Sequence, residues 1–309
     1  SFHRERHRLH AHRGQVRLAV RVPASTANLG SGFDCVGLAV DWFDELTLEV
    51  SRTGGVNVEV TGEGAHQVPR DESHLVVATL LHALQQWGTT PPGGLRLTAH
   101  NTIPHSRGLG SSAAAIVAGC ALAHGIAFPG EDLDRVELTR VSSFLEGHPD
   151  NAGAAVWGGA ILAWLDGERV ELIRLRPVEG LRCLAFVPDL EVRTEGARAV
   201  LPDVVSRRDA VAQAVAAASL PLALEQRPDL LLSATRDRLH QFQRAELMPT
   251  SWSLLRRLRR EGVPATISGA GPTVFAVGLE DQLAKAESLE HEGFQRHDLV
   301  PGGGVQLLD

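Results

Sequence analysis

The sequence contains no tyrosine and a single lysine, Lys285, among 309 residues. A mechanism that needs a lysine amine therefore has one candidate, which lies in an Ala- and Glu-rich stretch typical of a helix. Catalysis by lysine is thus disfavoured. Without tyrosine, only Phe and Trp side chains can stack on a bound base.

Cysteines and long apolar runs are also scarce. Cys35, Cys120 and Cys183 lie far apart in apolar surroundings and form no CxxC pair, which argues against a disulfide framework or a structural zinc site. We expect them to be small buried residues of a protein in a reducing compartment. No apolar run approaches about 18 residues without a charge, and the N-terminus lacks the apolar core of a signal peptide. The sequence therefore predicts a cytoplasmic protein without a membrane span.

Acidic residues outnumber basic ones, 37 to 30, which gives a net charge of −7. This charge repels nucleic acid and anionic membranes, so neither is expected as a partner. The composition, 43% hydrophobic and 22% charged, is that of a globular protein and excludes a disordered or collagen-like chain.

Residues 1–14 differ from the rest of the chain because they carry four His and four Arg and almost no apolar side chains. Such a segment cannot bury a face, so we expect a flexible basic extension or an artefact of the assigned start site. A His-rich tract can also bind metal, but a solvated arm is the favoured interpretation.

Hydrophobic periodicity predicts an irregular mixture of strands and helices from Val16 onward. The predicted strands are 16–24, 95–100, 181–188, 264–268 and 273–278, with hairpins at 46–60 and 160–175. The predicted helices are 73–87, 111–125, 131–146, 194–200, 207–224, 228–240, 251–260 and 280–291. The pattern favours the α+β class, with two domains that meet near residue 170.

The most specific segment is PHSRGLGSSAA, residues 104–114, in which glycines and small hydroxyls precede a helix. Unpaired amides at a helix N-terminus bind anions. Gly108 and Gly110 allow a close approach of the backbone to phosphate, and Ser111 and Ser112 add hydroxyls for phosphate or Mg²⁺. An ordinary capped helix is the alternative. Because no lysine follows the glycines and no acidic ribose-binding residue follows a strand about 20 positions later, two common nucleotide motifs are absent.

This segment resembles the ATP-binding signature of the GHMP kinases, a family that includes galactokinase, homoserine kinase, mevalonate kinase and phosphomevalonate kinase. Two further family motifs occur in the expected order, VPASTANLGSGFD at 22–34 and ISGAGPT at 267–273. Together with EGHPDN at 146–151, the first of these resembles the homoserine kinases in particular, whereas mevalonate-type and sugar kinases have an acidic residue in place of Asn151.

The resemblance covers nearly everything after residue 15 and implies the fold. It implies a ribosomal-protein-S5-like N-terminal domain that binds ATP, residues 15–170, and a ferredoxin-like C-terminal GHMP domain, residues 171–309. ATP and L-homoserine are expected in the cleft between them, and a homodimer is expected by analogy with the family.

The resemblance also implies the nucleotide site. Gly269 and Gly271 are expected to pack against the phosphate loop, and Mg²⁺ is expected on Ser112 and Glu146, with Glu137 as the alternative carboxylate. The spacing found in other family members would place the metal ligand at Arg140. Adenine is expected in an apolar slot between hairpin 46–60 and loop 101–107. The residues expected to contact ATP are Pro104, His105, Ser106, Arg107, Gly108, Leu109, Gly110, Ser111, Ser112, Ala113, Ala114, Gly269 and Gly271.

Homoserine is a zwitterion, so its site needs an acceptor for the ammonium group and cations for the carboxylate. The resemblance assigns the ammonium group to Asp34, with Asn28 beside it. These two residues could instead only hold their loop together. For the carboxylate it assigns Arg198 and Arg244, and Arg193 with less weight.

The resemblance places His148 and Asn151 near the substrate hydroxyl, with Thr194 approaching from the other domain. A lone His is otherwise more often a hydrogen-bonded core or turn residue. Because an amide cannot take a proton as a carboxylate can, no general base is evident. Catalysis is then expected to rely on positioning and charge neutralisation, with the hydroxyl proton passing to the γ-phosphoryl group.

The sequence thus favours an ATP-dependent homoserine kinase that makes O-phospho-L-homoserine in threonine biosynthesis. Two alternatives stay open. One is a GHMP-type kinase acting on a mevalonate-like acid or another amino alcohol, and the other is a non-catalytic protein that senses nucleotide.

Overall fold

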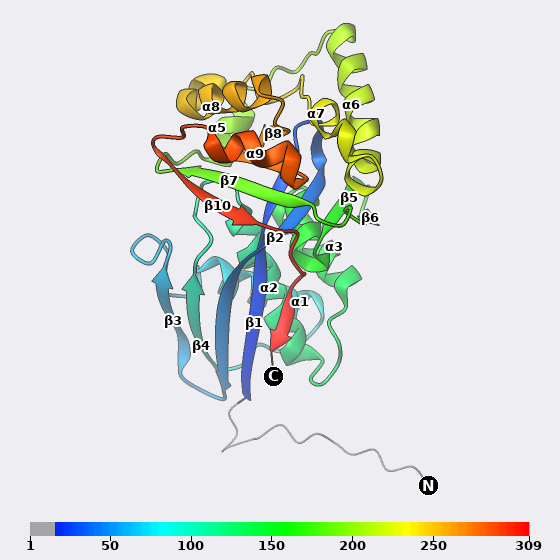
Figure 1. The fold of residues 1–309 in the computed structure, drawn as a ribbon. Helices are drawn as coiled ribbons and strands as arrows, with labels where there is room; N and C mark the ends of the chain where they lie inside the picture. The colour runs from blue at the N-terminus through cyan, green and yellow to red at the C-terminus, as the bar shows by residue number, and fades with distance from the viewer. Residues whose placement is uncertain (1–15, 309) are drawn as a thin grey trace.

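The computed structural model describes residues 16–308, so the predicted basic extension, residues 1–14, lies outside the described residues. The strands are β1 Val16–Asn28, β2 Gly32–Ser51, β3 Gly55–Gly62, β4 Gly94–Asn101, β5 Ala160–Asp166, β6 Arg169–Leu175, β7 Arg182–Pro188, β8 Ala265–Ile267, β9 Val274–Gly278, β10 Phe294–Leu299 and β11 Gln306–Leu308. The α-helices are α1 Leu75–Gln86, α2 Ser111–Ala127, α3 Arg135–Glu146, α4 Asp150–Trp157, α5 Thr194–Ala199, α6 Arg207–Glu225, α7 Leu231–Ala234, α8 Pro249–Arg260 and α9 Glu280–Ser288. Figure 1 shows the two sheets that the strands form, which confirms the predicted α+β class.

The larger sheet has the strand order β11-β1-β2-β4-β3, with β5 paired to β2 and β6 to β5. The predicted hairpin at 46–60 is wrong, because β4 lies between β2 and β3 and pairs in parallel with β3. Leu97 is fully buried at the centre of β4, opposite Leu48 on one side and Val58 on the other. Insertion of this apolar strand gives both neighbours a buried partner, which a local hairpin would not. The second predicted hairpin, β5–β6, is confirmed.

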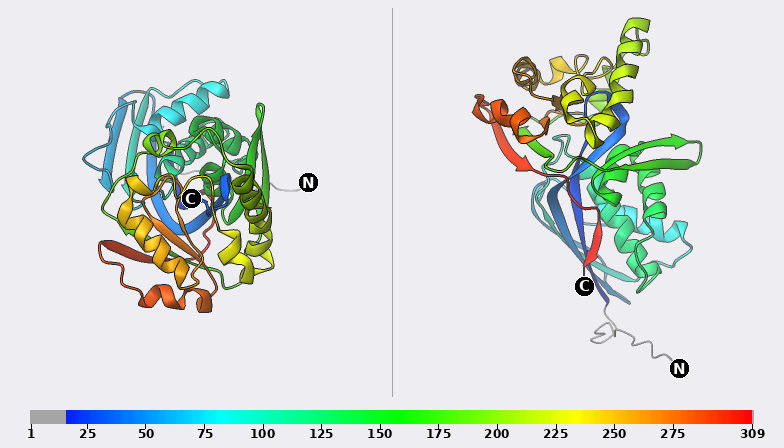
Figure 2. Two further views of the ribbon diagram at one scale, coloured as in Figure 1. Left: turned by 90° about the horizontal axis from the view of Figure 1, so that it is seen from above. Right: turned by 45° about the vertical axis from the view of Figure 1, so that its right-hand side comes forward.

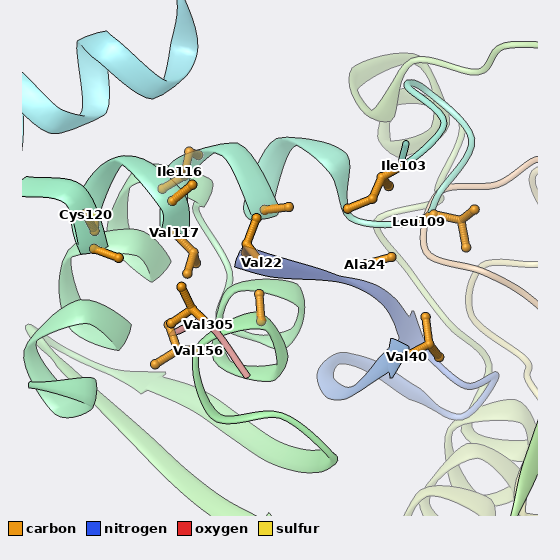
Figure 3. Close-up of a cluster of buried hydrophobic side chains, with 14 of the residues drawn as sticks. Val22, Ala24, Val40, Ile103, Leu109, Ile116, Val117, Cys120, Val156 and Val305 are labelled. Carbon is orange, nitrogen blue, oxygen red and sulfur yellow. The ribbon is translucent and has the colours of Figure 1, made fainter. Parts of the chain in front are cut away.

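Helix α2 lies at the centre of the first core. Its Ala- and Gly-rich sequence is buried on almost every side, against α1 on one side and β1 on the other. A Cβ at Gly119 would collide with the Val76 carbonyl of α1, so glycine permits the close helix contact. Figure 3 shows Val117 of α2 on the side of the helix that faces Val156 and Val305.

The smaller sheet has the order β10-β7-β9-β8 and its own core, with α5, α8 and α9 packed above it in Figure 1. Phe186 of β7, Ile267 of β8 and Leu258 of α8 are fully buried there. The apolar stripe of α8 faces this sheet, and Arg256, Arg257 and Arg260 are exposed. Arg259 is partly buried and donates to the Ala265 carbonyl of β8 at 2.8 Å.

Strands of the larger sheet come from both ends of the chain. After β10 the chain crosses back, forms a bridge between Val40 and Pro301, and pairs β11 with β1 (Figure 2, right). Strand β6 spans residue 170 and pairs with β5 in the same sheet. The division into domains at residues 170 and 171 stays a prediction, and the larger sheet contains strands from both sides of it.

Segment 228–240 also differs from expectation. Only Leu231–Ala234 is α-helical, preceded by the 3₁₀ turn Pro228–Leu230. The Asp237 carboxylate accepts hydrogen bonds from the backbone N–H groups of residues 239, 240 and 241, so it stabilises a separate turn instead of the interior of a helix.

The cysteines are free thiols, with Cys120 and Cys183 buried and Cys35 partly buried. Burial raises the pKa of Cys120 to about 12, so this thiol stays protonated and behaves as an apolar residue. Within residues 16–308, no helix has the length and apolar character needed to cross a membrane.

Candidate active site

A polar cavity lies where the phosphate loop, the β1–β2 loop and the C-terminal sheet meet. Seven of the eight side chains predicted for the acceptor line it, although they come from positions 28 to 244 of the chain. The eighth, Arg193, lies at the N-cap of α5 and does not line the cavity. Its lining residues are Ala27, Asn28, Phe33, Asp34, Ser106, Gly108, Gly110, Ser111, Ser112, Glu146, His148, Asp150, Asn151, Val192, Thr194, Arg198, Arg244, Gly269, Ala270 and Gly271.

The phosphate loop is shaped by two glycines in the left-handed region, Gly108 with φ 77° and Gly110 with φ 69°. A Cβ at Gly108 would collide with the Ser268 carbonyl oxygen, and one at Gly110 would collide with the Ser25 hydroxyl. The glycines therefore allow close packing against the protein's own backbone, beyond the approach to phosphate that the sequence suggested. Ser268 Oγ donates to the Gly108 carbonyl at 2.6 Å, so the loop is tied to the 267–273 motif.

Helix α2 begins at this loop without a side-chain cap. Gly110 occupies the N-cap position, and the first intrahelical bond runs from the Ala114 N–H to the Gly110 carbonyl, 2.9 Å. The amides of Ser111, Ser112 and Ala113 precede that bond and are available to an anion.

Several other residues predicted to contact ATP have side chains that do not line the cavity. Leu109, Ala113 and Ala114 are buried in the core, so only their backbone could meet a ligand (Figure 3 shows Leu109). Arg107 lies outside the cavity, and its guanidinium donates to the carbonyls of Pro188 and Asp189 beyond β7.

Ser112 and Glu146 are neighbours at the cavity wall, with Ser112 Oγ 3.2 Å from Glu146 Oε2. Burial raises the pKa of Glu146 above its usual 4.5, although His148 and Ser112 oppose the shift. The alternative carboxylate, Glu137, lies outside the cavity and accepts from Trp87 Nε1 at 2.8 Å and from Arg140 at 2.7 Å and 2.8 Å. Of the two predicted carboxylates, Glu146 is therefore the one next to Ser112.

Asp34 and Arg198 form a two-point ion pair, with Nη2–Oδ1 2.7 Å and Nη1–Oδ2 3.0 Å. Asn28 uses its amide on the backbone, since its Oδ1 accepts from the Asp34 N–H at 3.0 Å and its Nδ2 donates to the Gly269 carbonyl at 3.2 Å. The loop-holding role of Asn28 is thus present in the structure, while the side chain also lines the cavity.

Arg244 is 2% exposed and lines the cavity next to α5. Its Nε donates to the Ala197 carbonyl at 2.9 Å and its Nη1 to the Gly269 carbonyl at 3.2 Å. Burial, followed by the nearby charge of Arg198, lowers the pKa of Arg244 to about 10. The phenyl ring of Phe33 lies 5.7 Å from the Arg198 guanidinium and 5.6 Å from that of Arg244.

The EGHPDN segment ends α3 and begins α4. Asn151 Oδ1 accepts from Ser25 Oγ at 2.8 Å, and His148 Nδ1 lies 2.8 Å from Asp150 Oδ1. Burial lowers the pKa of His148, but the hydrogen bond and charge of Asp150 outweigh burial and raise the pKa above 6.5. Thr194, exposed at the start of α5, completes the wall.

Sequence reasoning missed Asp150, Phe33 and Ser25. Asp150 and Phe33 line the cavity, and Ser25 holds Asn151. Ser25 lies in the motif at 22–34 and Asp150 in the motif at 146–151, so their places in these motifs could have identified them as site residues. Nothing in the local sequence around Phe33 indicates that its ring lies beside two arginines.

A second, more apolar cavity adjoins the first through Ser106, Ser111 and Ser112. Leu46, Asn101 and His105 line it, in agreement with the slot predicted between hairpin 46–60 and loop 101–107. Residues 68–76, which the sequence did not indicate, form a further part of its wall, together with Val22, Asp44 and Ala115. The side chain of His74 is buried in this wall, and no hydrogen-bond partner for its Nδ1 lies within residues 16–308.

Comparison with known proteins gives two family matches, the GHMP kinases N terminal domain over residues 74–159 and the GHMP kinases C terminal domain over residues 219–293. The homoserine kinase of Cutibacterium acnes is 54% identical over 290 residues, with 94% of this chain and 98% of that protein covered. The homoserine kinase of Mycolicibacterium vanbaalenii is 47% identical, with 92% of each chain covered.

Solved structures agree with the sequence matches. The crystal structure of homoserine kinase from Cytophaga hutchinsonii superposes with a TM-score of 0.80 at 25% identity, covering 94% of this chain and 97% of the other. A mevalonate kinase superposes with a TM-score of 0.67 at 11% identity, covering 92% and 99%, which shows a shared fold.

Proposed function

The chain belongs to the GHMP kinases, and within them to the homoserine kinases, and from this premise we propose how its cavity transfers the γ-phosphoryl group of ATP to the hydroxyl of L-homoserine. The products are ADP and O-phospho-L-homoserine, an intermediate of threonine biosynthesis. One observation carries the assignment of residues, namely that seven of the eight predicted acceptor side chains line a single cavity together with the phosphate loop.

Asp34, Arg198 and Arg244 bind the two charged ends of homoserine. Asp34 accepts the ammonium group, and the two guanidinium groups bind the carboxylate. The ion pair between Asp34 and Arg198 supports this role. The substrate ammonium can replace Arg198 as the partner of Asp34, and the substrate carboxylate can replace Asp34 as the partner of Arg198. Both side chains are more than a third exposed, so the pair opens at little cost.

ATP lies across both cavities. The amides at the start of α2 bind the phosphates, and adenine occupies the apolar cavity beside Leu46 and Val68. The serines shared by the two cavities stand between these sites.

Mg²⁺ fits Ser112 and Glu146, since a hydroxyl and a buried carboxylate with oxygens 3.2 Å apart are the hard ligands that this ion prefers. Within residues 16–308, no group of three or more His, Cys, Asp and Glu side chains could hold a metal ion, so phosphate and water complete the coordination. When bound, Mg²⁺ neutralises charge on the transferred phosphoryl group.

The hydroxyl oxygen of homoserine forms the new bond to the γ-phosphorus as the bond from that phosphorus to the oxygen bridging to the β-phosphate breaks. The hydroxyl proton passes to an oxygen of the transferred group. Asn151, fixed by Ser25, orients the hydroxyl and takes no proton. The Asp150 carboxylate is 1% exposed and already bonded to His148 and to the Asn151 N–H, so it orients the segment instead of acting as a base.

The direct test is ADP release from Mg·ATP with a panel of acceptors, L-homoserine, mevalonate and other amino alcohols, and the product identified by ³¹P NMR. We expect turnover on L-homoserine well above all others. Turnover on mevalonate alone would contradict the substrate assignment, and nucleotide binding by calorimetry without turnover would support the sensor alternative.

A further inference from the structure

His240 is fully buried directly behind the acceptor-binding residues, at 0% exposure. Its Nε2 lies 2.8 Å from the Gly30 carbonyl oxygen and its Nδ1 lies 3.3 Å from Arg244 Nη1. The imidazole also stacks on Phe33, with ring centroids 4.9 Å apart and planes inclined by 21°. One side chain therefore contacts the β1–β2 loop, an arginine of the acceptor site and the aromatic ring that lies beside both arginines.

These partners fix the protonation state of the ring. The Gly30 carbonyl can only accept, so Nε2 carries the hydrogen. The Arg244 guanidinium can only donate, so Nδ1 presents its lone pair. Burial also favours the neutral ring, because it lowers the pKa of His240, although Asp237, the Gly30 carbonyl and Asp34 oppose this shift.

The contacts of Arg244 show what this orientation achieves. Nε is bonded to Ala197, and Nη1 to Gly269 and His240, whereas Nη2 donates to no acceptor within residues 16–308. Three acceptors on two nitrogens hold the plane of the guanidinium and leave Nη2 for a ligand in the cavity.

We propose that His240 is a positioning residue for homoserine, which acts through Arg244: its Nδ1 lone pair holds the guanidinium in the plane that meets the substrate carboxylate, and its Nε2–H holds the Gly30 loop that carries Phe33 and Asp34. The proposal rests on the proposed function and adds to it a residue that does not line the cavity. It predicts an effect on the binding of homoserine and not on the binding of ATP.

The test compares two substitutions that each retain half of the ring. His240→Asn keeps an acceptor near the Nδ1 position, and His240→Gln keeps a donor near the Nε2 position. We expect His240→Gln to raise the homoserine KM about tenfold or more, because a hydrogen bond to a charged group is lost. His240→Asn should raise it several-fold less, and neither should change the KM for ATP by more than about twofold.

A double-mutant cycle with Arg244→Ala supplies the control for a merely structural role. In the Arg244→Ala background, His240→Gln should add no more than about twofold to the homoserine KM. Thermal unfolding of all four proteins reports whether each is folded. Equal homoserine KM values for the Asn and Gln variants, or full additivity with Arg244→Ala, would overturn the inference, whereas absent turnover on homoserine by the wild-type protein would instead overturn the proposed function.

Discussion

Arg198 and Asp34, 164 positions apart in the chain, form an ion pair with two hydrogen bonds of 2.7 Å and 3.0 Å. The two residues were assigned to opposite ends of the same zwitterion. Under the proposed roles, the substrate binds by exchanging ion-pair partners with these two residues, so each protein charge has a counter-charge before and after binding. A site built in this way discriminates against ligands that carry only one of the two charges.

Removal of Arg198 should weaken the binding of homoserine specifically. Arg198→Ala deletes the bidentate donor and leaves Asp34 unpaired, so we expect the homoserine KM to rise on the order of tenfold to a hundredfold, with the ATP KM almost unchanged. Steady-state kinetics with each substrate varied in turn will measure this. Arg227→Ala is a matched control, because Arg227 makes the same two-point pair with Asp229 on the surface. An unchanged homoserine KM in Arg198→Ala would remove this residue from the site.

Removal of either oxygen ligand should change the Mg²⁺ dependence of the reaction. Ser112→Ala and Glu146→Gln are each expected to lower kcat roughly tenfold or more and to raise the Mg²⁺ concentration needed for half-maximal rate. Glu137→Gln is the control, since this carboxylate is occupied by Trp87 and Arg140. Normal Mg²⁺ titration curves for Ser112→Ala and Glu146→Gln, with an altered one for Glu137→Gln, would reverse the assignment of the carboxylate.

Glu146 should reduce stability at neutral pH in the absence of ligands. Burial raises its pKa above 4.5, so the folded state binds the proton more tightly than the unfolded state, and stability falls as pH rises from about 4.5 through the raised pKa. Glu146→Gln removes this ionisation. The variant should therefore be more stable than wild type near pH 8, with a smaller difference near pH 4.5, in urea unfolding. A variant that is less stable at both pH values would contradict the prediction.

His148 should stabilise the folded protein at low pH and lose this contribution as the pH rises. Its pKa is raised above 6.5 despite burial because Asp150 stabilises the imidazolium, so the stabilising contribution is complete below about 6.5 and disappears as pH rises through the folded pKa. Asp150→Asn should lower this pKa. A two-dimensional NMR titration of the histidine rings in both proteins measures the shift, and an unchanged His148 titration in the variant would exclude Asp150 as its cause.

The phosphate loop should tolerate no side chain at Gly108. Gly108→Ala combines a left-handed backbone with a collision against the Ser268 carbonyl. Gly130→Ala has the same sign of φ, but the added Cβ meets no atom within 4 Å. We expect Gly130→Ala to cost ~1–2 kcal/mol, and Gly108→Ala to cost at least ~1 kcal/mol more and to weaken ATP binding as well. Equal losses of stability and unchanged ATP binding would show that the contact between loop and 267–273 motif is dispensable.

The site was predictable where its chemistry lies in contiguous motifs. The phosphate loop, the 267–273 turn and the EGHPDN segment each keep their residues together in sequence, so each could be assigned a role before its neighbours were known. The cavity brings these motifs together. The motifs did not reveal which distant side chains hydrogen-bond to their residues. Ser25, which donates to Asn151, lies 126 positions away in the chain.

The remaining errors have physical causes in long-range packing. Hairpin 46–60 fitted the local pattern, but β4 offers both of its edges to β2 and β3. The apolar residues of 228–240 suggested one helix, whereas Asp237 uses its carboxylate to bind three amides and turns the chain toward His240 and Arg244. Local propensity did not reveal that this turn places an arginine at the cavity.

The pairing of β11 with β1 has a consequence for how the chain is made. Residues 306–308 are synthesised after all the other described strands and helices, yet they pair with residues 19–21 of β1. The larger sheet therefore lacks one strand until every strand of the smaller sheet has been synthesised. A nascent chain stalled before residue 300 would expose the edge of β1 and would be a natural target for chaperones.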